Sequence, residues 1–167
     1  IYIAVLHDGT SLSFKMKILM VGVGGAGCEF LIQLTEYLKS EECEEWTDEL
    51  VLVDADVVEE SNLHRQRLFS VEDIGRSKVQ VAAEKFGLGA IGIASKVEDL
   101  NDLTFFGQFD CFILAVDNLE TRRWLNSTVF QAKRSHHSMW FLLDFGVQGF
   151  KCSIRSYVGG GEKSDAS

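Results

Sequence analysis

The sequence predicts a doubly wound, Rossmann-like α/β domain whose sheet is mostly parallel, with helices on both faces and an antiparallel edge at its C-terminal end. Two observations carry this prediction. Short, continuously apolar runs alternate with longer amphipathic segments, which is typical of parallel strands covered on both faces. The first apolar run also ends in a glycine-rich turn, Gly22-Val-Gly24-Gly25-Ala-Gly27, as the first crossover of such folds often does.

The first half of the chain contains three predicted strands and two predicted helices. In order, these are a strand at Lys17–Val21, a helix at Glu29–Lys39, a strand at Leu50–Val53, a helix at Ser77–Phe86 with Ser77 as its N-cap, and a strand at Ala90–Ser95. The acidic stretch Glu41–Asp48 separates the first helix from the second strand, and we expect it to form a solvated loop.

The second half contains three more strands around one helix. We expect a strand at Cys111–Val116, a helix at Leu119–Lys133, strands at Trp140–Phe145 and Lys151–Val158, and a tight connection at Gly146–Gly149 between the last two. The length fits one domain, which we place at residues 1–158 with its core at 16–158. Residues 159–167 are expected to form a flexible tail.

The composition is that of an ordinary globular domain, with 46% apolar and 25% charged residues among 167. A formal charge of −9 argues against nucleic acid as a partner, because phosphate backbones are bound by clustered basic residues. No apolar run approaches the roughly 20 residues that span a bilayer. The four cysteines form no CxxC pair, which predicts a reducing compartment, the cytoplasm or the nucleus. The absence of a first Met and of proline suggests a fragment of a longer chain.

The glycine loop by itself indicates a nucleotide at the point where a strand meets a helix. Asp54 ends the next predicted strand, where a carboxylate can accept hydrogen bonds from ribose hydroxyls. On these two features alone the expected ligand is NAD. The alternative is that the glycines serve only the close packing of helix on strand.

The segment after Asp54 favours a different chemistry. A nicotinamide site needs one acidic residue and then an apolar slot, but here a second carboxylate follows at Asp56, and then polar and basic residues: Asn62, Arg65, Gln66 and Lys78. Carboxylates suit a hard divalent cation that holds phosphates, and Arg and Lys suit charge on phosphoryl oxygens. Together they predict phosphate chemistry assisted by a metal ion.

Three separated motifs, GVGGAGCE, DADVVEESNLHRQRLF…IGRSK and LAVDNLETRRWLN, occur in this order. With them the chain resembles the adenylation domain of the ubiquitin-activating (ThiF/MoeB-like) superfamily, which includes bacterial relatives in thiamine and molybdopterin biosynthesis. The resemblance covers roughly Lys17 to Tyr157, and LLDFGVQGFKCSIRSY resembles the strand pair that closes the family's domain.

This resemblance implies adenylation of the C-terminal carboxylate of a ubiquitin-like or sulfur-carrier protein, with ATP and Mg²⁺, in a homo- or heterodimer of like domains. It also implies the roles of single residues. The nucleotide would be bound by the loop glycines Gly22, Gly24, Gly25 and Gly27, by Asp54 at the ribose and by Asn118 beside it, with Asn62 and Gln66 as polar lining. Magnesium would be held by Asp56 and Asp117, and the catalytic residues would be Arg65, Lys78 and Asp117.

Several alternatives stay open at this point. Asp117 and Asn118 have the residue types that cap a helix, and the predicted helix starts at Leu119. The chain shows no thioester cysteine motif, no pair of CxxC motifs and no N-terminal arginine-bearing helix, although members of the family have them. A non-catalytic or partner-dependent relative of the same fold is therefore one alternative, and an NAD-dependent oxidoreductase is another. Between the two kinds of partner, the stretch NLHRQ slightly favours a sulfur-carrier protein over a ubiquitin-like protein.

Overall fold

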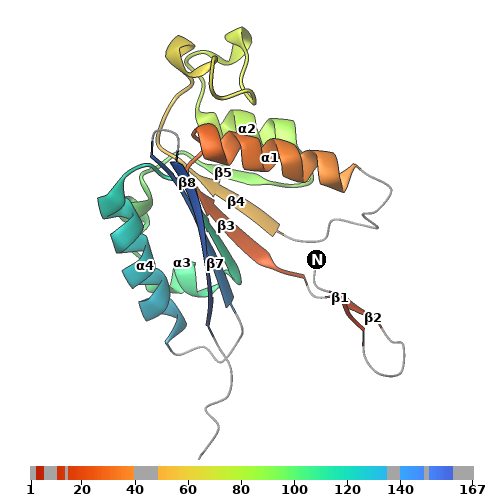
Figure 1. Cartoon of the computed structure of the whole chain (residues 1–167), viewed down its shortest axis with the longest axis vertical. Helices are drawn as coiled ribbons and strands as arrows, with labels where there is room; N and C mark the ends of the chain where they lie inside the picture. Colours follow the sequence, from red (N-terminus) through yellow and green to blue (C-terminus); the bar gives the residue numbers. More distant parts are fainter. Residues whose placement is uncertain are drawn as a thin grey trace, which may run out of the picture.

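The computed structural model describes residues 3–5, 11–13, 15–39, 49–134, 140–148 and 151–159. These residues form a six-stranded sheet with helices on both faces, and a separate pair of short strands (Figure 1). The predicted fold class is confirmed. The acidic stretch that contains Cys43 and Trp46, the two histidines at 136 and 137 and residues 160–167 of the predicted tail lie outside the described residues.

The strands of the sheet are β3 (Lys17–Val21), β4 (Glu49–Val53), β5 (Ile91–Ile93), β6 (Cys111–Leu114), β7 (Trp140–Gln148) and β8 (Lys151–Gly159). The α-helices are α1 (Gly25–Leu38), α2 (Lys78–Phe86), α3 (Leu103–Gly107) and α4 (Leu119–Lys133). Short 3-10 helices lie at η1 (Glu60–Asn62), η2 (Val71–Asp73) and η3 (Val97–Leu100).

The strand order is β5-β4-β3-β6-β7-β8, in which β8 alone is antiparallel to its neighbour. The two central strands, β3 and β6, lead to opposite halves of the sheet: β3 crosses through α1 to β4, and β6 crosses through α4 to β7. The loops that leave these two strands therefore diverge. A doubly wound sheet has its crevice at this divergence, beyond the carboxyl ends of the strands.

The central strands are buried on both faces. Ile18 and Met20 of β3 pack into one apolar cluster with residues of α1 and α2, whereas Leu19 and Val21 pack into a second cluster with residues of α3 and α4. Figure 1 shows the same arrangement, with the two helix pairs on opposite faces of the sheet. Each fully buried Leu, Val or Phe stabilises the fold by roughly 1.5–3 kcal/mol relative to exposure. The two clusters thus hold the strand ends in place.

Most predicted elements are present, and the differences concern their ends. Helix α1 starts at Gly25, four residues before the predicted start, so that Gly25 and Gly27 of the glycine loop belong to its first turn. Ser77 holds the N-cap position of α2, but its hydroxyl makes no capping bond within the described residues. Strands β5 and β6 end earlier than predicted, at Ile93 and Leu114.

The predicted position of the connection between the last two strands, Gly146–Gly149, is wrong for residues 146–148. Strand β7 continues through them to Gln148, which pairs with Lys151 of β8. Gly159, which the sequence assigned to the tail, is the last residue of β8. Long antiparallel pairing overrides the local preference of glycine for turns, since each added pair contributes ladder hydrogen bonds.

Three kinds of element were not predicted. The strands β1 (Ile3–Val5) and β2 (Ser11–Ser13) form a small antiparallel pair of their own, and α3 and the 3-10 helices are short. Segments of three to five residues show too few periods for a hydrophobic pattern to be recognised.

Candidate functional site

The glycine loop joins β3 to α1 at the crevice between β3 and β6. Gly22 adopts a φ of +94°, and a Cβ atom there would lie 2.7 Å from the carbonyl oxygen of Ala115. A Cβ atom on Gly27 would overlap the carbonyl oxygen of Gly22. Both positions therefore require glycine for the packing of loop, strand and helix. Gly24 and Gly25 differ, because they line an open cavity.

The start of α1 faces this cavity with free backbone donors. Gly24 is its N-cap residue and provides no side-chain bond, so the first N–H groups of a 14-residue helix are left without a capping partner among the described residues. Unpaired N–H groups and the helix dipole favour an anion at such a position. The loop can therefore accept a phosphate group.

Asp54 holds the glycine loop to the end of β4. One carboxylate oxygen accepts a hydrogen bond from the N–H of Val23 at 2.7 Å, and the other accepts from the N–H of Asp56 at 2.8 Å. A carboxylate has about four acceptor sites, so two remain for a ligand. The residue predicted at the ribose thus has a second task, which is to shape the loop.

Lys78 and Asp56 form an ion pair at the same wall of the cavity, with Nζ 3.0 Å from Oδ2. The lysine side chain is only 7% exposed, whereas that of Asp56 is 68% exposed. The backbone joins the two segments as well, since the N–H of Lys78 donates to the carbonyl of Asp56 at 3.0 Å. The ammonium group therefore comes from a buried stem and is fixed at the cavity.

Two further predicted residues, Arg65 and Gln66, also line the cavity. Arg65 is exposed, and its side chain makes no hydrogen bond or ion pair with the described residues, so its guanidinium can bind a ligand. Gln66 is 2% exposed, and its Oε1 atom is buried without a partner in the described part of the chain. A buried acceptor without a donor costs about 1–3 kcal/mol, which a ligand N–H or O–H can offset.

Asn62 does not line the cavity, contrary to the prediction. It is buried as the last residue of η1, where its Oδ1 accepts from the N–H of Glu59 at 3.1 Å and its Nδ2 contacts Ser61. It shapes the segment that carries Arg65 instead, because the N–H of Arg65 donates to the carbonyl of Asn62 at 3.0 Å. Gly27, packed behind the loop, is likewise absent from the lining.

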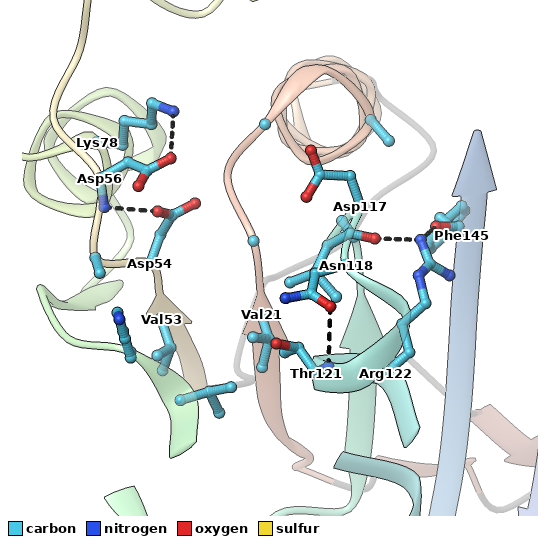
Figure 2. A pocket seen from close by; sticks show the side chains of 18 of the residues that line it. Val21, Val53, Asp54, Asp56, Lys78, Asp117, Asn118, Thr121, Arg122 and Phe145 are labelled. Carbon is cyan, nitrogen blue, oxygen red and sulfur yellow. Dashed lines mark hydrogen bonds and ion pairs between the residues drawn. The ribbon is translucent and has the colours of Figure 1, made fainter. Parts of the chain in front are cut away.

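Asp117 and Asn118 follow β6 on the other side of the glycine loop (Figure 2). Asn118 is the N-cap of α4, and its Oδ1 accepts from the N–H groups of Glu120 at 2.8 Å and Thr121 at 3.4 Å. The capping alternative is therefore correct for Asn118. Asp117 is exposed, and no hydrogen bond joins its carboxylate to the described residues.

The cavity has a volume of about 1060 Å³ and is lined from both halves of the sheet. Of the predicted residues it gathers ten: Gly22, Gly24, Gly25, Asp54, Asp56, Arg65, Gln66, Lys78, Asp117 and Asn118. Charged and polar residues that the sequence did not single out line it too: Ser95, Lys96, Glu98, Asp99, Thr121 and Arg122. The first four of these follow β5 and lie far from the recognised motifs in sequence, but Arg122 lies within one of them.

The two carboxylates predicted to share a metal ion lie apart. Figure 2 shows Asp56 beside Lys78 on one side of the glycine loop and Asp117 on the other. Within the described ranges, no three His, Cys, Asp or Glu side chains gather in a group that could hold a metal. Magnesium is commonly bound through one or two carboxylates plus substrate phosphates. The residues therefore fit an ion that arrives with a triphosphate, with Asp117 as its free carboxylate.

A buried carboxylate at Asp73 supports the segment that carries Lys78. It accepts hydrogen bonds from the N–H and hydroxyl of Ser70, both at 2.9 Å, from Lys85 Nζ at 2.5 Å and from Arg76 Nη1 at 3.4 Å. It thus connects η2 to the last turn of α2. Two residues of this segment also bond to the backbone of Val58. The N–H of Gly75 donates to the carbonyl of Val58, and the N–H of Val58 donates to the carbonyl of Arg76.

Replacing Asp73 by asparagine is expected to lower the free energy of unfolding at pH 7 by about 2 kcal/mol, because bonds to a charged acceptor are lost. Burial by itself raises the pKa of Asp73, but hydrogen bonds from Lys85 and Ser70 outweigh it and the pKa falls from 3.8 to about 2. Since the folded-state pKa is below the unfolded value, this contribution is complete above about pH 5 and is lost as the pH falls through about 2.

Urea unfolding at pH 7 and at pH 3 measures this effect, and the difference between variant and wild type should be smaller at the lower pH. Glu72→Gln, at the exposed neighbouring acid, is the control and should change stability little. A variant as stable as the wild type at pH 7 would contradict the role given to Asp73.

The family follows from a comparison with known proteins. The model of the ThiF family matches residues 3–166. This chain belongs to the ThiF family. Within it, curated relatives include the NEDD8-activating enzyme E1 catalytic subunit of Saccharomyces cerevisiae, 33% identical over 150 residues, and ubiquitin-activating enzyme E1 1 of Triticum aestivum, 32% identical over 162 residues.

The ThiF-family chain spans less than half the length of these relatives. The alignments cover 86% and 90% of this chain, but 48% of the yeast protein and 15% of the wheat protein. Among solved structures, E. coli MccB with succinimide matches with a TM-score of 0.56 and 23% identity over 78% of this chain and 36% of that one. PaaA matches with a TM-score of 0.61 and 20% identity over 83% and 40%. These structures support the fold.

Two further findings bear on the ThiF-family chain as a whole. No helix among the described residues is long and apolar enough to cross a membrane. Cys28, directly behind the glycine loop, is buried, and burial raises the pKa of its thiol to about 12. A thiol with so high a pKa is a poor nucleophile, which agrees with a packing role for Cys28.

Proposed function

We propose that this chain is the nucleotide-binding part of an enzyme that uses magnesium and ATP to adenylate the C-terminal carboxylate of a ubiquitin-like protein. The observation that carries the proposal is the single cavity beyond the carboxyl ends of β3 and β6, where the loops that leave these strands diverge. It gathers a helix start with free N–H groups, the cations Arg65 and Lys78, and the free carboxylate of Asp117. The relatives, a NEDD8-activating enzyme E1 catalytic subunit and a ubiquitin-activating enzyme E1, support a ubiquitin-like partner over a sulfur-carrier protein.

The reaction joins two anions. An oxygen of the partner's terminal carboxylate attacks the α-phosphorus of ATP, the bond from that phosphorus to the bridging oxygen of the β-phosphate breaks, and pyrophosphate leaves. The product is an acyl-adenylate. Positioning and charge neutralisation make up most of the catalysis in such transfers.

The residues divide this task. Asp54 accepts from the ribose with its remaining lone pairs, and the start of α1 receives phosphate oxygens. Lys78 and Arg65 offset charge that develops on the phosphates, in a cavity where such interactions are stronger than in bulk water. Magnesium, when bound, neutralises phosphate charge, and Asp117 is the residue we assign to hold it. Asp56 pairs with Lys78, and we assign it to holding that ammonium group at the cavity.

Two further properties belong to this proposal. Cys28 and Cys111 form no disulfide bond in the described part of the chain, and we propose the cytoplasm or the nucleus as the compartment from the cysteine pattern of the sequence. We also propose a homo- or heterodimer of like domains, in which the second domain supplies further residues to the site.

Calorimetry of ATP and NAD, each with and without magnesium, tests the ligand in the full-length protein that contains this chain. We expect ATP to bind with an affinity that rises at least tenfold with magnesium, and NAD to bind weakly or not at all. Tight NAD binding that ignores magnesium would instead support an oxidoreductase. Pyrophosphate–ATP exchange that depends on an added ubiquitin-like protein, and is absent with one that lacks its last two residues, then tests the acceptor.

A further inference from the structure

A buried ion pair at the end of the sheet plays no part in the roles given so far. Arg122 comes from the first turns of α4 and Asp144 from β7, with side chains that are 13% and 8% exposed. Burying two charges costs several kcal/mol of lost hydration per ion, so such a pair adds little net stability compared with apolar residues of similar size. The main effect of the pair is therefore on the positions of the segments that it joins.

The guanidinium of Arg122 donates to three oxygens on two separate segments. It binds the carboxylate of Asp144, the carbonyl of Phe145 on the same strand, and the carbonyl of Val116 in the loop between β6 and α4. Figure 2 shows Arg122 reaching from α4 to β7 beside Phe145. A planar guanidinium with five donors can serve three acceptors at fixed angles, which an ammonium group cannot do in the same way.

The third contact lies next to the proposed metal ligand. Val116 directly precedes Asp117, so the orientation of its carbonyl fixes the peptide plane that leads into Asp117. On the other side, Asn118 is held by its capping bonds to α4. The carboxylate of Asp117 itself has no hydrogen bond to the described residues, so its place depends on these two flanking anchors.

We infer that Asp144 is a positioning residue: its carboxylate fixes Arg122, and Arg122 fixes the Val116–Asp117 backbone so that Asp117 points into the cavity. This inference rests on the proposed function, because it assumes that Asp117 binds a metal ion with the nucleotide. Asp144 lies beside Leu114, the last residue of β6, in the strand register. The pair therefore couples the middle of β7, beside the end of β6, to α4 at the cavity wall.

The test uses Asp144→Asn, Arg122→Lys and the double variant in the full-length protein. Asp144→Asn keeps the shape of the side chain and removes its charge. Arg122→Lys keeps the positive charge and removes the planar guanidinium that donates to three acceptors. Arg123→Lys, at the exposed neighbour on α4, is the matched control. Three quantities are measured: the magnesium concentration for half-maximal ATP binding, the affinity for adenosine, and amide hydrogen exchange of the peptide at residues 115–119.

We expect each single change to raise the half-maximal magnesium concentration about tenfold, and the double change to raise it no further, since residues that act as one unit are not additive. Adenosine affinity should change less than about twofold, because adenosine carries no phosphate or metal. Exchange at 115–119 should become faster, while exchange in β3 stays the same. The control should behave as the wild type.

The inference fails if the magnesium dependence of Asp144→Asn equals that of the wild type, or if adenosine affinity falls as far as that of ATP, which would indicate a general loss of structure. It also fails if exchange at 115–119 is unchanged. A wild-type protein that binds no magnesium-ATP contradicts the proposed function itself, whereas the exchange result still shows whether Arg122 holds the loop.

Discussion

Replacing Asp117 by alanine is expected to lower the rate of pyrophosphate–ATP exchange by at least about 100-fold, with the melting temperature close to that of the wild type. The side chain is exposed at the cavity and makes no hydrogen bond to the described residues, so little folded structure depends on it. The exchange assay measures adenylation directly, because it reports the reversible formation of the acyl-adenylate.

Glu120→Ala is a suitable control for this variant. Glu120 is an exposed acid in the first turn of α4, three residues after Asp117, and is absent from the cavity lining. Its loss removes a similar charge from the same region and should leave exchange within about twofold, at a cost in helix stability of well under 1 kcal/mol. Near-normal exchange in Asp117→Ala would refute the metal assignment.

Lys78→Met is expected to reduce exchange by a similar factor, about 100-fold or more, since it removes an ammonium group that a buried stem holds at the cavity wall. Methionine keeps most of the apolar stem in place. The partner carboxylate of Asp56 is 68% exposed and stays hydrated without the lysine, so the protein should remain folded. Exchange kinetics and a thermal melt on the same sample measure both quantities.

The matched control is Lys133→Met, a second buried lysine far from the cavity. Lys133 lies near the end of α4, donates to the carbonyl of Gly107 at 2.9 Å, and is 4% exposed. Here the expected effect is reversed, with lower stability and unchanged exchange per folded molecule. If both variants lost exchange in proportion to stability, Lys78 would have a structural role and no direct one.

The recognised motifs predicted most of the cavity. Three motifs that are far apart in the chain, around Gly24, Arg65 and Asp117, do meet at one place. This could be predicted because parallel strands deliver their carboxyl ends to the same edge of the sheet, so polar residues after each strand converge there. The roles of these residues in catalysis remain predictions.

The same reasoning failed where the partner of a side chain lies on another element. Asn62 was predicted to line the site but is buried in η1, and the sequence did not predict the ion pair between Asp56 and Lys78. The role of Asp144 could not be predicted, because its partner Arg122 lies 22 residues away on α4. Which of several available polar partners a side chain takes depends on distances that no linear pattern contains.

The sequence by itself determined the order of strands and helices, the glycine loop and the chemistry of the residues after each strand, because apolar periodicity and residue type are local properties. The tertiary structure decided which carboxylate is left free for a ligand. Of Asp54, Asp56 and Asp117, two are engaged by backbone N–H groups or an ammonium group, and Asp117 alone faces the cavity without such a bond among the described residues. A carboxylate to which folding brings no donor keeps all of its acceptor sites for a metal ion.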